Sequence, residues 1–151
     1  CRIGELAEEL RRGPVVGSAL FRQVLGEVAD GVRSAAEADL RDVIKRGRLP
    51  MPMFNARLYA GSVLIAVADA WWPDAGVAAE ADSREWHLSP EEWEQTMRRH
   101  ARMTAQGILV LHFTPRQIRT EPDQVMAAVR AALEAGRTAR QPQVRALPAS
   151  A

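Results

Sequence analysis

The stretch "SVLIAVADAWWPDAGVAAEAD", from Ser62 to Asp82, contains the strongest structural signal in the sequence. Two apolar, strand-like runs, residues 62–69 and 76–82, are separated by a segment that contains Pro73 and Asp74. Proline and aspartate favour turns. The two runs are therefore expected to pair as a β-hairpin.

Two helices are predicted before this hairpin. Residues 18–31 and 34–47 carry apolar side chains at helical spacing, and Gly31 is the expected end of the first helix. Ser34 with Glu37 three residues later is a capping-box pattern, which predicts that the second helix begins at Ser34. Glu37 would then lie in the first turn of that helix.

Strands and helices alternate around and after the hairpin. Residues 54–59 and 108–113 are predicted strands, and the second is apolar throughout, which favours a central position in the sheet. Residues 88–107 and 120–136 are predicted helices, the latter ending at Gly136. The side chains expected to face inward from the first of these helices are Trp93, Met97, Ala101 and Thr104. The order predicts an α/β fold with a mixed sheet flanked by helices.

Composition bounds the class of protein. The chain has 151 residues, 47% hydrophobic and 26% charged, which suits one globular domain, predicted over residues 18–136. Residues 1–17 are interpreted as a linker or the remnant of a missing upstream domain, because the first residue is Cys1. Residues 137–151 contain three arginines and no acid, which predicts a disordered basic tail.

The same composition indicates a cytoplasmic protein. No apolar run reaches the length of a membrane span, and the charged N-terminal stretch does not have a secretory signal pattern. The single cysteine excludes an internal disulfide and a cysteine-based zinc cage. The net charge of +1 gives no overall basic signal for nucleic acid.

Acidic residues gather at the ends of the two hairpin strands. Glu80 and Asp82 share a face because side chains alternate along a strand. Counting back across the turn places Asp69 roughly opposite residues 78–80, near Glu80. Carboxylates this close repel one another unless a cation holds them, and such oxygen ligands suit Mg²⁺ or Mn²⁺. The alternative is that Asp69 caps a turn and the other two acids lie on a solvated face, and composition alone favours it.

Two further residues support the metal site. Glu37 is expected on the inward face of its helix, whose N-terminus would bring a positive dipole end towards the acids. His87 could deprotonate water or protonate a leaving oxygen, or it could be a packing or capping residue. His100 and His112 have weaker cases.

This order of residues resembles the domain-of-unknown-function family 559 over roughly residues 34–134. The family pattern is a strand-end aspartate, an acid-x-aspartate at the next strand end, a nearby histidine and an apolar strand that ends in Phe-Thr. It falls here on Asp69, Glu80, Asp82, His87, Phe113 and Thr114. The family is similar to very-short-patch repair endonucleases, within the PD-(D/E)xK nuclease superfamily. The resemblance therefore implies a restriction-endonuclease-like fold and metal-dependent hydrolysis of DNA.

The resemblance also implies partners and shows departures. Actinobacterial domains of this kind often follow the winged-helix domain of abortive-infection-type antitoxins, which implies such an upstream domain or a toxin partner. The motif lysine would stand at position 82, where this chain has Asp82, and the usual following glycine is Ser83.

Two function hypotheses follow. In the first, a Mg²⁺-dependent endonuclease, Asp69 and Glu80 bind the metal, Asp82 tunes the site, Glu37 holds metal-bound water and His87 is the acid or base. Candidate phosphate contacts are Arg84, Arg98 and Arg99, although a solvated helix face is the favoured interpretation of Arg98 and Arg99. The second hypothesis is a catalytically inactive binding or regulatory module, favoured by the missing lysine and the low net charge.

Overall fold

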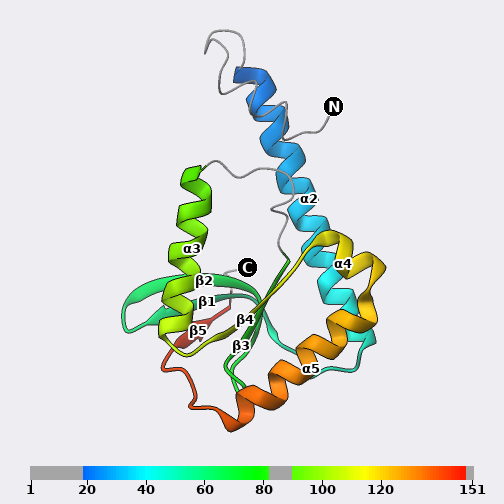
Figure 1. The fold of residues 1–151 in the computed structure, drawn as a ribbon. Coiled ribbons are helices and arrows are strands. Elements are labelled where there is room, and N and C mark those ends of the chain that lie inside the picture. Colours follow the sequence, from blue (N-terminus) through cyan, green and yellow to red (C-terminus); the bar gives the residue numbers. More distant parts are fainter. Residues whose placement is uncertain (1–18, 82–89, 149–151) are drawn as a thin grey trace.

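A five-stranded mixed sheet forms the centre of the structure (Figure 1). The computed structural model describes residues 19–81 and 90–148. The strand order is β4-β3-β2-β1-β5, antiparallel except for the parallel pair β3 and β4. The strands are β1 (Met53–Ala60), β2 (Val63–Trp72), β3 (Val77–Ala81), β4 (Leu109–Phe113) and β5 (Arg145–Leu147). The predicted α/β class with a mixed sheet flanked by helices is confirmed.

The predicted hairpin is the junction between β2 and β3. The two strands pair antiparallel from Trp72 opposite Val77 to Ala70 opposite Ala79, and Pro73 lies in the turn between them. Gly76 closes this turn with a φ of +62°, a conformation that glycine adopts at little cost.

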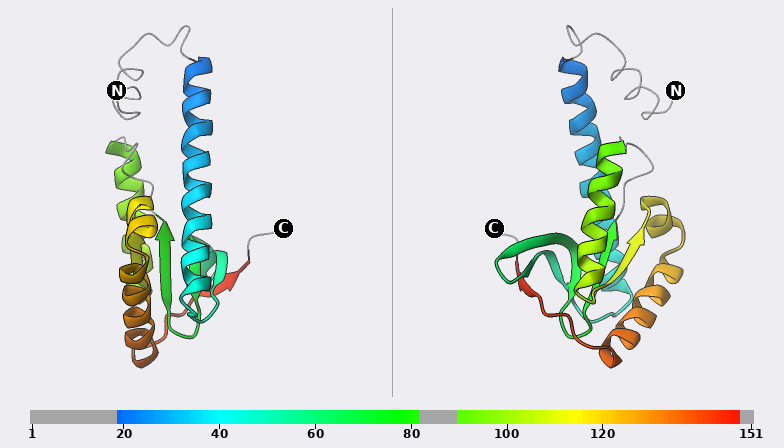
Figure 2. Two further views of the ribbon diagram at one scale, coloured as in Figure 1. Left: turned by 90° about the vertical axis from the view of Figure 1, so that its right-hand side faces the viewer. Right: turned by 60° about the vertical axis from the view of Figure 1, so that its left-hand side comes forward.

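Helices cover both faces of the sheet (Figures 1 and 2). One face packs against α2 (Ala19–Arg46), α4 (Pro115–Thr120) and α5 (Pro122–Thr138), and the other packs against α3 (Pro90–Ala105). The first core contains Leu40, Ile44, Val129 and Leu133 from the helices together with alternate residues of β3. The second contains Met103 of α3 with Ala78 and Trp71. Because the two cores share β3, its successive side chains belong to different faces.

The two helices predicted before the sheet are one continuous helix. α2 runs through Gly31 and Ser34, so the predicted break and the N-cap at Ser34 are wrong. A single glycine in a helix costs about 1 kcal/mol, which packing of the helix can offset. The capping-box spacing of Ser34 and Glu37 therefore occurs within a helix rather than at its beginning.

Two other expectations about the sheet and its ends are wrong. β4 lies at an edge of the sheet, not at its centre, and Leu109 is exposed there. The disorder predicted for residues 137–151 does not hold for Arg145–Leu147, which form β5 on the opposite edge beside β1. The order of strands in the sheet depends on pairing between distant segments. The apolar composition of β4 and the basic composition of residues 137–151 therefore do not predict it. The predicted linker of residues 1–17 lies outside the described residues.

The helices in the described part of the chain include none long and apolar enough to cross a membrane.

Thr114 begins α4 as an N-cap, directly after the buried Phe113. Its side chain accepts a hydrogen bond from the Gln117 N–H at 3.2 Å, and Gln117 Oε1 accepts one from the Thr114 N–H at 2.9 Å. Thr114→Ala is expected to lower the free energy of unfolding by about 1 kcal/mol, because it leaves a helix-end N–H without its partner. Urea denaturation would measure the loss. The matched variant Thr138→Ala, at an exposed threonine near the end of α5, should change stability by less than about 0.5 kcal/mol.

Candidate functional site

Among the described residues, Glu80 is the charged residue whose side chain is buried. Only 5% of the residue is exposed. It lies between Ala79 and Ala81 near the end of β3. Those two alanines belong to the core formed with α2 and α5. Since side chains alternate along a strand, Glu80 faces the opposite side, towards α3.

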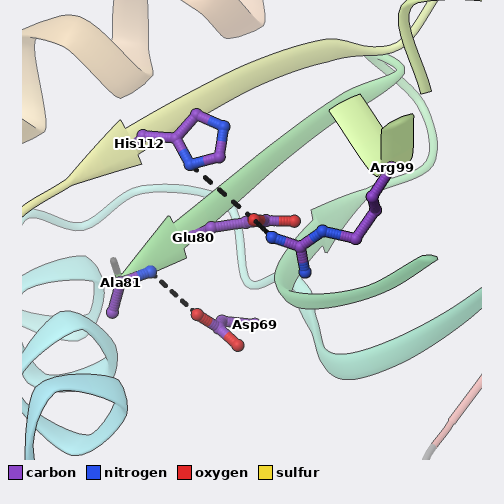
Figure 3. Close-up of polar contacts among 5 residues, drawn as sticks. All are labelled: Asp69, Glu80, Ala81, Arg99 and His112. Atoms are coloured by element: carbon purple, nitrogen blue, oxygen red, sulfur yellow. Dashed lines mark hydrogen bonds and ion pairs between the residues drawn. The ribbon is translucent and has the colours of Figure 1, made fainter. Parts of the chain in front are cut away.

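Two cationic or potentially cationic groups meet the Glu80 carboxylate (Figure 3). Arg99 of α3 donates from Nη2 to Glu80 Oε2 at 2.6 Å. His112 Nδ1 lies 3.7 Å from the same oxygen. The parallel pairing of β3 and β4 places His112 directly beside Glu80, which explains why the two side chains share a face. Three elements therefore converge on one buried carboxylate.

A second histidine extends this cluster. The rings of His100 and His112 meet edge-to-face with centroids 4.9 Å apart. His100 follows Arg99 on α3, so adjacent residues of one helix contact both β3 and β4. We call Glu80, Arg99, His100 and His112 the Glu80 cluster. It combines a carboxylate, a guanidinium that is always charged and two imidazoles. Such groups can bind anions or transfer protons.

Asp69 lies on β2, next to Ala70, the last residue that pairs with β3. Its Oδ2 accepts a hydrogen bond from the Ala81 N–H at 2.8 Å. The β1–β2 register places Asn55 across from Asp69, between the pairs Phe54–Ala70 and Ala56–Ala68, and Asn55 has a φ of +50°. Asp69 thus occupies an irregular point of the sheet, where a carboxylate satisfies a strand N–H.

The register brings Asp69 and Glu80 onto neighbouring strands, as the sequence predicts. The pairing runs as far as Ala70 with Ala79, so Asp69 and Glu80 are the next residue on each strand. Their carboxylates nevertheless contact different groups, Ala81 N–H for Asp69 and Arg99 for Glu80 (Figure 3). Each acid therefore makes a polar contact of its own.

The type of donor atom determines which metal ions a site can bind. Carboxylate oxygens of Asp69 and Glu80 are of the type that Mg²⁺ and Mn²⁺ prefer. Within residues 19–81 and 90–148, no group of three or more histidine, cysteine, aspartate or glutamate side chains is arranged to hold a metal ion. Asp82 and His87, which the sequence assigns to the same site, lie outside the described residues, as do Ser83 and Arg84.

Glu37 does not lie on the face of the sheet that Glu80 occupies. It belongs to α2, whose neighbouring residues Ala36 and Leu40 pack in the core that contains Ala79 and Ala81. Glu37 is half-buried within the helix, and no helix begins near it. The expectation that a helix N-terminus at Ser34 directs its dipole at the acids is therefore wrong.

The predicted phosphate contacts Arg98 and Arg99 have different surroundings. Arg98 is 73% exposed and pairs with Glu94 at 2.9 Å across one helical turn, so its interpretation as part of a solvated face holds. Arg99 is 34% exposed and turns to Glu80, so the same interpretation is wrong for Arg99. The inward face of α3 is consequently formed around Arg99, His100 and Met103, whereas Ala101 and Thr104 are exposed.

Two tryptophans of the hairpin are buried. Trp71 and Trp72 are buried on opposite faces of β2, and Trp72 Nε1 donates to the Pro50 carbonyl oxygen at 2.6 Å. Both side chains therefore pack in the core and form no exposed stacking surface. Trp86 lies outside the described residues.

The sequence did not identify the partners of Glu80. For Arg99 it favours a solvated helix face over a phosphate contact, and for His112 it gives only a weak case as a site residue. The available signal was the spacing of Arg99 and Met103, four residues apart on the helix, which places both on one face. The pairing of His112 with Glu80 follows from the parallel register, which sequence does not specify.

Fold and site together define an α/β domain in which basic and imidazole side chains gather around the buried Glu80 at the parallel strand pair. No family model and no solved structure matches the chain. The chain is 30% identical over 130 residues to the uncharacterized protein MT2308 of Mycobacterium tuberculosis strain CDC 1551 / Oshkosh. It has the same similarity to the uncharacterized protein Rv2248 of strain ATCC 25618 / H37Rv. Each match covers 85% of this chain and 46% of the relative, so the chain spans about half the length of these relatives.

Proposed function

We propose that this chain is a metal-dependent endonuclease domain that hydrolyses phosphodiester bonds in DNA. The observation that carries the proposal is the position of Asp69 and Glu80 on adjacent strands at one end of the β2–β3 hairpin. Glu80 is also the point where the basic and imidazole side chains of α3 and β4 meet. Acids of this kind beside cationic groups suit a substrate that carries phosphate.

Each residue has a task in this proposal. Asp69 and Glu80 would hold Mg²⁺, which supplies charge stabilisation for the phosphate and lowers the pKa of a bound water. Asp82 would tune the acidic site, and His87 would act as the acid or base. His112 is a second imidazole beside Glu80, at 3.7 Å from its carboxylate. Arg84 would contact the phosphate backbone of DNA.

The test is cleavage of supercoiled plasmid with Mg²⁺ or Mn²⁺. Asp69→Ala and Glu80→Ala are each expected to lower the cleavage rate by about a hundredfold or more, since each removes a metal ligand. Glu134→Ala, which removes an exposed carboxylate from α5, is the matched control and should leave the rate unchanged. Circular dichroism would establish that the variants fold. Cleavage that survives both substitutions would show that the site is elsewhere.

A second candidate function is a binding or regulatory module that retains the fold without the chemistry. The ion pair between Glu80 and Arg99 favours it, because an internal guanidinium already neutralises the carboxylate. Position 82 also holds Asp82 where the nuclease motif has a lysine. Absence of cleavage by every folded form, together with salt-dependent retardation of DNA in a gel, would favour this function over the nuclease.

A further inference from the structure

Among the described residues, one side of the sheet is open at the end formed by β1, β2 and β5. On the side opposite α3, α2 contacts the sheet mainly at β3, and α5 contacts it mainly at β3 and β4. β5 and the neighbouring parts of β1 and β2 extend away from these helices (Figure 1). Side chains that point to this side from the three strands are therefore not covered by the helices that cover β3 and β4.

Strand pairing places six side chains on this open side, in two rows that cross the three strands. Leu58 of β1 belongs to the core formed with α3, and Ala146 of β5 packs against that core. Because side chains alternate along a strand, the residues on either side of Leu58 and Ala146 point to the opposite, open side. The rows are Val67–Arg57–Leu147 and Leu64–Tyr59–Arg145, and we call these six residues the Arg57 face.

The Arg57 face is apolar and basic. The solvated side of an antiparallel sheet is normally polar, yet Leu64, Val67 and Leu147 are 45%, 43% and 40% exposed. Its two charged members, Arg57 and Arg145, are both exposed, and none of the six residues is acidic. Exposed apolar side chains that gather beside charged ones mark interaction surfaces. The sign of the charge indicates an acidic partner.

We propose that the Arg57 face binds an amphipathic helix of a partner protein, with an apolar stripe bordered by acidic side chains. The flat side of a sheet is covered by a helix elsewhere in this fold, where α3 packs on the other side. The aliphatic side chains of the Arg57 face would contact the apolar stripe. The inference goes beyond the nuclease function and does not depend on it, because Glu80 faces the opposite side of the sheet, towards α3.

The spacing of the two arginines matches one turn of such a helix. Arg145 pairs with Tyr59, which lies two residues from Arg57, so the two arginines are diagonal neighbours on adjacent strands. Diagonal neighbours in a sheet are about 7–8 Å apart. Acidic side chains at positions i and i+4 of a helix are about 6 Å apart, so two of them can contact both guanidiniums.

Two other occupants fit this face less well. A second copy that met it around a two-fold axis would bring two arginines against two arginines, because such an interface joins the same patch to itself. Single-stranded nucleic acid binds on aromatic rings that stack with its bases. The aromatic residue of this face, Tyr59, is half-buried, and Arg145 already lies over its ring, 5.4 Å from the centroid.

Fluorescence anisotropy with two synthetic peptides tests the proposal. Both are amphipathic helices of about 18 residues with a leucine stripe, bordered in one by glutamates and in the other by lysines. Wild type is expected to bind the glutamate peptide at least tenfold more tightly than the lysine peptide, and the preference should weaken as salt is added. Equal affinity for the two peptides, or binding of neither, would overturn the inference.

Variants at exposed positions locate the binding surface. Val67→Asp and Arg57→Glu should each lower the affinity for the glutamate peptide on the order of tenfold, and Arg57→Glu should also bind the lysine peptide more tightly than wild type does. Met51→Asp and Arg130→Glu are the matched controls, because both residues are exposed and lie outside the Arg57 face. They should leave the affinity unchanged. Losses in the controls as large as those in the variants would count against this face.

A measurement on wild type does not depend on the folding of a variant. Backbone amide resonances of β5 and of residues 57–67 should shift as the glutamate peptide is added, and those of β4 should not. Shifts confined to β4 or α5 would overturn the inference. Binding of a labelled oligothymidine that both Val67→Asp and Arg57→Glu weaken would assign the face to nucleic acid instead. A dimer in sedimentation that Val67→Asp dissociates would assign it to a second copy.

Discussion

Replacing Gly136 with alanine is expected to lower the free energy of unfolding by about 3 kcal/mol. A Cβ at this position of α5 would overlap the carbonyl oxygen of Ala75 and stand 3.1 Å from Val77 Cγ2. The obstacle is the backbone carbonyl group of Ala75, in the turn between β2 and β3. It cannot rotate away as a side chain would. The helix must shift from the sheet, which opens the core around Leu133. Chemical denaturation followed by circular dichroism would measure the loss.

Gly31 provides the control for that experiment. It also lies in a helix, α2, but nothing stands within 4 Å of an ideal Cβ there. Gly31→Ala should therefore raise stability by about 0.5–1 kcal/mol, because alanine loses less backbone freedom on folding. If Gly136→Ala and Gly31→Ala shifted stability in the same direction, contact between α5 and the hairpin turn would not be what requires glycine at position 136.

These two glycines show what local sequence reveals. Local sequence predicts that both end helices, since glycine often does so, yet both lie inside helices. Gly31 is tolerated by the long helix, and Gly136 is required by a close approach to a turn some sixty residues earlier, at Ala75. The hairpin was predictable because its signals, apolar strand-like runs and turn residues, are local. Contacts between distant segments leave no such signal.

The same distinction explains how much of the site was predictable. Counting across a short turn predicts that Asp69 and Glu80 lie near each other, and the pairing of β2 with β3 ends at Ala70 with Ala79, the residues next to them. The convergence of Arg99 and His112 on Glu80 depends on the parallel pairing of β3 with β4, across the whole of α3. Glu37 illustrates the opposite case: the capping-box spacing of Ser34 and Glu37 predicts a helix start, but the residues on both sides continue the helix.

Removing Arg99 is expected to destabilise the protein more than removing the charge of its partner. Arg99→Met should cost about 3 kcal/mol, because it leaves the Glu80 carboxylate buried at 6% exposure without its guanidinium. Glu80→Gln should cost about 1 kcal/mol, since Gln keeps the shape and Arg99 retains access to water. Thermal and urea denaturation in metal-free buffer would measure both.

The double variant decides whether the buried charge is the cause. With both Arg99→Met and Glu80→Gln, no carboxylate remains to be neutralised, so the loss should be smaller than for Arg99→Met alone. Arg98→Met, next along α3 at an exposed pair, should change stability by less than about 0.5 kcal/mol. A double variant as unstable as the sum of the single ones would mean that Arg99 stabilises the fold by packing of its stem. In that case Glu80 would not depend on Arg99 to neutralise its charge.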